Sequence, residues 1–201
     1  MDRMHRLADE VRAVFEDRGY KVDKATSLDR AFSRSRRSQS SLSRDLVLDA
    51  IEHAASGLGL GFGPVRGGAY DIGYVTDGAD RRFRVRKAAI NPETGEYEIV
   101  AGSENFMVID DAEPESMYPT ERWVFALTTD GAGMVIDIFA ARVLDTTDET
   151  VPRLVLGDVI PLGESIYNPP TPGTYVPDDE DDLGDFDKEQ DDQDEDETGL
   201  G

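Results

Sequence analysis

Two stretches near the start of the chain carry apolar side chains at the three- and four-residue spacing of an amphipathic helix. The first covers residues 4–18 and stops before Gly19, which suits the left-handed position just past a helix end. The second covers about residues 44–56. Between them, Ser27 is a suitable N-cap for a short helix over residues 28–32. The pattern therefore predicts two or three helices before the first strand.

Residues 33–43 lie between the predicted helices and consist mainly of serine and arginine, with no apolar period. This composition is typical of a flexible linker. Ser43, at the end of the segment, is a good N-cap for the helix that follows. Residues 1–32 are accordingly expected to form a helical N-terminal arm.

From residue 69 onward the apolar period changes from that of a helix to that of a strand. Residues 57–68 are rich in glycine and predict a loop, and Asn91–Gly95 and Thr129–Gly133 predict turns. The expected strands cover residues 69–76, 81–89, 96–101, 106–110, 122–128, 134–144 and 153–162. The fold class is therefore α+β: one domain over residues 44–166, with a mainly antiparallel or mixed sheet preceded by two or three helices.

Residues 167–201 form a proline-rich and then strongly acidic tail. The chain has a net charge of −22, and residues 178–197 hold 14 acidic side chains and one lysine, which gives −13 for this segment. Such a segment has no core to bury and repels itself, so we expect it to be disordered. Four roles are open for the tail: it increases solubility, it imitates a phosphate backbone, it docks on a basic protein, or it competes with nucleic acid for a basic surface of the same protein. Leu183 and Phe186 are its candidate anchors for a partner.

The segment 81–89 alternates arginine with apolar residues, so Arg82, Arg84 and Arg86 are expected on one face of a strand. Arginines on a sheet face either contact phosphate groups or pair with acids on a neighbouring strand, here Glu96 and Glu98. The candidate nucleic-acid contacts, taken together with the serine- and arginine-rich segment, are Arg34, Arg36, Arg37, Arg82, Arg84, Arg86 and Lys87.

The residue inventory excludes several classes of chemistry. The chain has no cysteine, so disulfides, thiolate nucleophiles and cysteine-ligated metals are excluded. His5 and His53 are its two histidines, and no spacing indicates a metal or cofactor site. No apolar run is long enough to span a membrane, and the charged N-terminus is not followed by an apolar signal core. We expect a cytoplasmic protein without cofactors.

Glu52 on a predicted helix, Asp71 near the start of a strand and the basic strand 81–89 together resemble the core of the PD-(D/E)XK nuclease superfamily. The resemblance covers about residues 44–100. In that family a helix glutamate, a strand aspartate and an acid-x-lysine element hold a divalent metal and its water. Here Arg84 and Arg86 stand in place of the acid and the lysine. The resemblance therefore implies an inactive relative, with Glu52 and Asp71 as its remaining catalytic candidates.

These features favour a non-catalytic binding or regulatory protein that acts on or near nucleic acid, with the acidic tail competing for its basic surface. One alternative is an acidic DNA mimic, or decoy, that occupies a basic protein partner. A further alternative is a phage-type structural or assembly protein. A metal-dependent nuclease is disfavoured because the acid-x-lysine element is missing.

Overall fold

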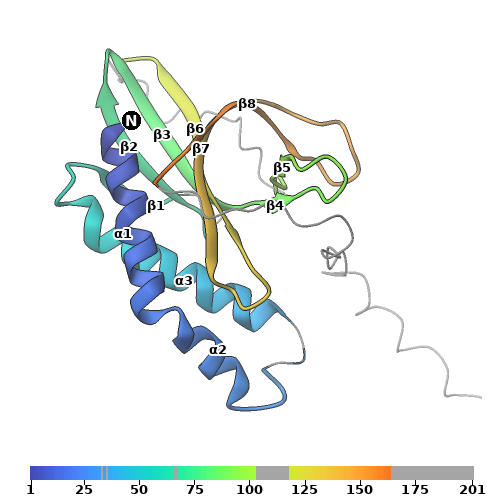
Figure 1. Ribbon diagram of the computed structural model, residues 1–201. Coiled ribbons are helices and arrows are strands. Elements are labelled where there is room, and N and C mark those ends of the chain that lie inside the picture. Colours follow the sequence, from blue (N-terminus) through green and yellow to red (C-terminus); the bar gives the residue numbers. More distant parts are fainter. Residues whose placement is uncertain (33, 35, 66–67, 103–117, 164–201) are drawn as a thin grey trace, which may run out of the picture. The chain divides into compact units, whose positions relative to one another are not determined.

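The computed structural model describes residues 1–32, 34, 36–65, 68–102 and 118–163. Within them, three helices precede the strands, as the sequence predicts for the α+β class (Figure 1). The helices are α1 (Asp2–Arg18), α2 (Tyr20–Ser27) and α3 (Arg36–Ala55). The strands are β1 (Gly61–Pro64), β2 (Tyr70–Thr76), β3 (Ala79–Lys87), β4 (Ala89–Ile90), β5 (Tyr97–Glu98), β6 (Thr120–Thr129), β7 (Val135–Thr146) and β8 (Leu154–Pro161).

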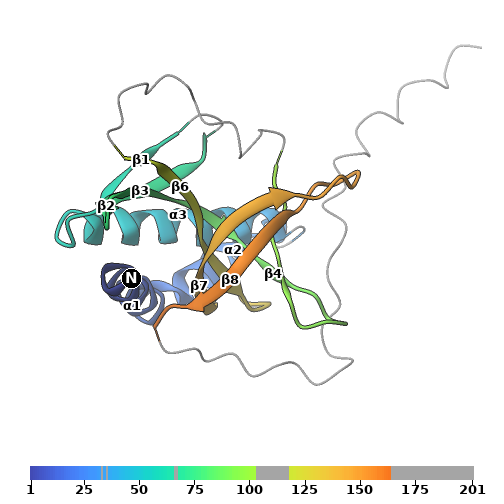
Figure 2. The ribbon, with the colours of Figure 1, turned by 90° about the horizontal axis from the view of Figure 1, so that it is seen from above.

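The main sheet has six strands in the order β1-β2-β3-β6-β7-β8 (Figure 2). Adjacent strands in it run antiparallel, except for β3 and β6, which run parallel. The predicted hairpin of residues 122–128 and 134–144 is confirmed as β6 and β7. The segment expected to pair with β3, residues 96–101, instead contains β5, which pairs with β4. The predicted glycine-rich loop contains β1.

The helices cover one face of the sheet, where they form its larger hydrophobic core. Its fully buried members include Met4, Leu7 and Val11 of α1, Ile51 of α3, and Ile72, Phe83, Phe125 and Ile138 of the sheet. A smaller core on the opposite face contains Ile99, Val124, Phe139 and Leu154. The predicted N-terminal arm packs against the sheet, because α1 supplies much of the larger core.

The predicted second helix is displaced. Helix α2 ends at Ser27, which the capping pattern places at the start of a helix, and residues 28–32 follow it as a turn. Val22 and Thr26, four residues apart, are the buried side chains of α2. Because these two side chains lie on the same face and are buried together, the helix forms over residues 20–27 and not over residues 28–32.

The predicted linker is corrected by the structure, since residues 36–43 form the first two turns of α3. Ser43 is buried within that helix rather than capping it, and its hydroxyl donates to the Gly133 carbonyl at 3.1 Å. Gln39 donates to the Gly131 carbonyl at 3.2 Å. These hydrogen bonds with the β6–β7 turn stabilise helix in a segment whose composition alone favours a linker.

Gly19 is in right-handed helical geometry, with φ −58° and ψ −36°, and not in the left-handed position expected from the sequence. Glycine is needed at this position because a side chain would not fit. A Cβ atom at this position would lie 2.5 Å from the Met134 sulfur and 2.5 Å from the Phe15 carbonyl oxygen. Glycine therefore permits the junction of α1 and α2 to approach the start of β7.

Replacing Gly19 with alanine is expected to lower the free energy of unfolding by about 2 kcal/mol, because the added methyl group overpacks this junction. Urea unfolding followed by circular dichroism measures the change. Gly131→Ala is the matched control, since a Cβ there meets nothing within 4 Å, and its effect should stay within about 0.5 kcal/mol. Equal stability of the two variants would contradict the packing role of Gly19.

Several predictions concern parts of the chain outside the described residues. They include the strand over residues 106–110, the domain end at residue 166 and the tail over residues 167–201. Among the described residues, no helix combines the length and apolar character that crossing a membrane requires.

Candidate arginine-rich binding face

Strand β3 places three arginines on the sheet face opposite the helices. Phe83 packs in the helix-side core, so the alternation of side chains turns Arg82, Arg84 and Arg86 to the other face, as predicted. Strand β6 adds Arg122, which lies directly beside Arg82 in the parallel register. We call these four residues, Arg82, Arg84, Arg86 and Arg122, the arginine face.

Two aspartates form ion pairs with arginines of this face. Arg84 makes two hydrogen bonds to Asp71 of β2, from Nε to Oδ1 at 2.6 Å and from Nη2 to Oδ2 at 3.2 Å. The two side chains are 12% and 14% exposed, so the pair is largely shielded from water. Arg82 donates from Nε to both oxygens of Asp80, at 3.0 and 2.9 Å. The four guanidinium groups therefore lie around two carboxylates of the described residues.

Burial and neighbouring cations change the pKa values of two arginines. Burial lowers the pKa of Arg86 below its ordinary value, and the nearby Arg84 lowers it further, whereas Asp71 opposes the change. Burial also lowers the pKa of Arg122, with Arg84 again the strongest charged neighbour. Arginine stays protonated in proteins, so both directions mean that the cations are held at a cost in free energy.

Gly73 of β2 gives Arg82 room to reach Asp80. It pairs with Arg82 across the strands, and a Cβ at Gly73 would lie 3.2 Å from the Arg82 Cδ atom. The arginine stem therefore lies over a position without a side chain. The glycine pattern of this strand did not indicate that role.

The other predicted contacts lie elsewhere. Lys87 is exposed at the end of β3 and, by alternation, belongs to the side of Phe83. Arg34 and Arg37 are exposed around the start of α3, in the helical layer, and the Arg36 side chain is outside the described set. Leu183 and Phe186 also lie outside the described residues. The structure thus brings together three of the seven predicted nucleic-acid contacts.

The alternative pairing of these arginines with Glu96 and Glu98 is not what the structure shows. Glu98 lies 2.6 Å from Arg153 and accepts a hydrogen bond from Asn91. Among the described residues, Arg84 instead binds Asp71 of the neighbouring strand β2, and Arg82 binds Asp80, two residues before it on β3 itself.

Sequence reasoning missed Arg122 and Asp80 as members of the face. The alternation of residues 120–129 does place Arg122 on the side away from Trp123, which is a usable signal. What no local pattern indicates is that this strand pairs with β3.

The two catalytic candidates, Glu52 and Asp71, lie on different sides of the sheet. Glu52 is exposed on α3, which packs on the side of Ile72, whereas Asp71 faces the other way and binds Arg84. Within the described ranges, no group of three or more histidine, aspartate or glutamate side chains could hold a metal ion.

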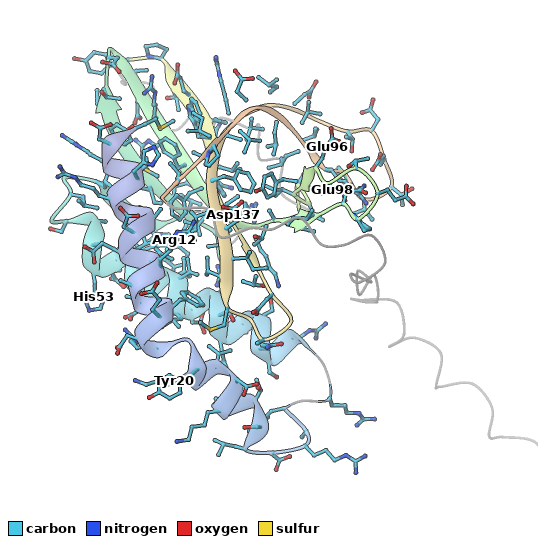
Figure 3. All side chains as sticks on the ribbon, in the orientation of Figure 1. Arg12, Tyr20, His53, Glu96, Glu98 and Asp137 are labelled. Atoms are coloured by element: carbon cyan, nitrogen blue, oxygen red, sulfur yellow. The ribbon has the colours of Figure 1, made fainter. Side chains whose placement is uncertain are left out.

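A second polar cluster joins three elements around Asp137, a buried residue of β7 (Figure 3). Its carboxylate accepts hydrogen bonds from the Tyr97 hydroxyl and from the Ile138 amide, the latter at 3.0 Å. Arg12 of α1 lies 3.8 Å away and also donates to the Leu162 carbonyl. The cluster links α1 to both faces of the sheet, and its buried geometry indicates a structural role.

Comparisons with known proteins give no independent indication of family or function, since no family model, curated protein or solved structure matches the chain.

Proposed function

We propose that this chain is a non-catalytic binding protein that acts on nucleic acid in the cytoplasm and contacts phosphate groups through the arginine face. The observation that carries the proposal is the gathering of four guanidinium groups from two adjacent strands on one face of the sheet. Guanidinium groups bind phosphate oxygens through paired, charge-assisted hydrogen bonds.

The acidic segment 178–197 is proposed to compete with nucleic acid for the same face. Its sequence carries a dense negative charge, as a phosphate backbone does. A competitor within the same chain acts at a high effective concentration. The tail would then set how much of the arginine face is available at a given salt concentration.

Fluorescence anisotropy with labelled single- and double-stranded DNA and RNA tests this function. The full chain is compared with a chain that ends at Pro177, at low and moderate salt. The shortened chain is expected to bind about 10-fold more tightly at low salt, because the repulsion and competition of the tail are gone. The binding should weaken as salt is raised, since binding to phosphates releases counterions.

The double variant Arg82→Gln, Arg122→Gln assigns the binding to the arginine face. It should bind less tightly, and the slope of its salt dependence should fall by about one unit for each phosphate that is no longer bound. Arg6→Gln is the control for the loss of each charge, because it removes one positive charge from an exposed position of α1. Absence of binding by both the full and the shortened chain would overturn the proposal and leave the acidic decoy and the structural or assembly protein as the alternatives.

A further inference from the structure

Helix α2 carries apolar side chains on the side that faces away from the core. Its buried residues are Val22 and Thr26, whereas Tyr20 is 59% exposed and Leu28, just after the helix, is 75% exposed. Positions 20, 24 and 28 are four residues apart, and Leu28 keeps helical backbone angles, so Tyr20, Lys24 and Leu28 form one row. Lys24 lies between the two apolar side chains of this row, so the row presents apolar and charged groups on the same side.

A second exposed aromatic residue follows this row. Phe32 is 49% exposed and sits in the turn after α2, where its amide donates to the Asp29 carbonyl. We call Tyr20, Lys24, Leu28 and Phe32 the α2 surface. Its two rings lie within a short segment of chain between α1 and α3.

The surroundings of the α2 surface are positively charged. The exposed cations of this segment, besides Lys24, are Lys21, Arg30, Arg34 and Arg37. The exposed acids between Tyr20 and Arg37 are Asp23 and Asp29. Glu16 and Asp17, one turn before Tyr20, are also exposed, so five cations face four carboxylates around this surface. The excess of cations lies toward Phe32, and it suits an anionic partner.

We propose that the α2 surface binds single-stranded nucleic acid, with Tyr20 and Phe32 stacking on bases and the surrounding cations contacting phosphates. The combination of exposed rings with cations is what single-strand binding requires, because each base offers a π-face and each linkage a negative charge. A duplex keeps its base faces stacked inside, so the rings would gain nothing from it. This inference rests on the proposed function and names its ligand class: the arginine face contacts phosphates of either form, and the α2 surface selects the single strand.

The test uses the full chain and the variant Tyr20→Leu, Phe32→Leu, which keeps apolar side chains at both positions and removes the rings. Anisotropy is measured with a labelled oligothymidine and with a labelled duplex at one salt concentration. The variant is expected to bind the single strand about 10-fold less tightly or weaker still, with duplex binding unchanged. Leu144→Ala, an exposed apolar position on β7, is the control for loss of surface area and should bind as the unaltered chain does.

The outcomes separate the two proposals. If single-strand affinity is the same in the leucine variant, the stacking role is overturned, while weaker binding by Arg82→Gln, Arg122→Gln still supports the arginine face. If the leucine variant binds anionic vesicles as well as the unaltered chain does, and neither binds the oligothymidine, the α2 surface is a membrane-binding surface and the inference fails. If no nucleic acid binds to any chain, the proposed function fails as well. Thermal unfolding confirms in each case that the variant is folded.

Discussion

Replacing Asp71 with alanine is expected to lower the free energy of unfolding by about 3 kcal/mol. The substitution removes both hydrogen bonds that Arg84 donates to Asp71, at a pair whose side chains are 12% and 14% exposed. It also removes a carboxylate that stabilises Arg86 and Arg122 against their neighbouring guanidinium groups. Urea unfolding of the full chain measures the loss.

Two further variants distinguish a buried ion pair from an ordinary surface pair. Glu149→Ala removes an exposed partner that lies 3.9 Å from Arg153, and its cost should stay below about 1 kcal/mol. Replacing Asp71 and Arg84 together with apolar residues should cost less than Asp71→Ala, because the buried charge is removed with its partner. If Asp71→Ala lowered the free energy of unfolding no more than Glu149→Ala does, the Asp71–Arg84 pair would behave as an exposed surface pair, which would contradict this prediction.

Replacing Asp137 with alanine is expected to cost about 3 kcal/mol, because it removes a buried carboxylate that accepts hydrogen bonds from Tyr97 and Ile138 and lies 3.8 Å from Arg12. The substitution should loosen α1 from the sheet, so hydrogen exchange of α1 amides should increase more than that of β2 amides. Asp137→Asn is the matched variant, since it keeps an acceptor and removes only the charge. A full-sized destabilisation in Asp137→Asn would identify the ion pair with Arg12 as the main contribution, and an unchanged stability of Asp137→Ala would contradict the cluster's structural role.

The parts of this fold that follow from local pattern were predictable. The alternation of residues 82–86 places three arginines on one face because side chains of a strand alternate, whatever its neighbours are. The β6–β7 hairpin follows from the turn at Asp130, whose carboxylate accepts from the Ala132 and Met134 amides. The α1 helix follows from the spacing of its apolar residues, most of which face the core.

The parts that depend on interactions between distant segments were not predictable. The start of α3 reads as a linker because its composition is polar, and only its hydrogen bonds to the β6–β7 turn explain the helix. The sequence predicts Gly19 as a helix terminator, because nothing in the residues around it indicates its close approach to Met134. The arginine face was therefore only partly predictable: β3 supplied its residues by alternation, and Arg122 required the parallel pairing with β6.

The parallel pairing of β3 with β6 also has a consequence for synthesis on the ribosome. Arg82 and its neighbour Arg122 are separated by about 40 residues, so one edge of β3 stays without its partner strand for about 2–8 s at ordinary elongation rates. An exposed strand edge with apolar side chains invites pairing with other chains, and charged side chains discourage it. The arginines of β3 are therefore expected to reduce pairing of this open edge with other chains until β6 emerges.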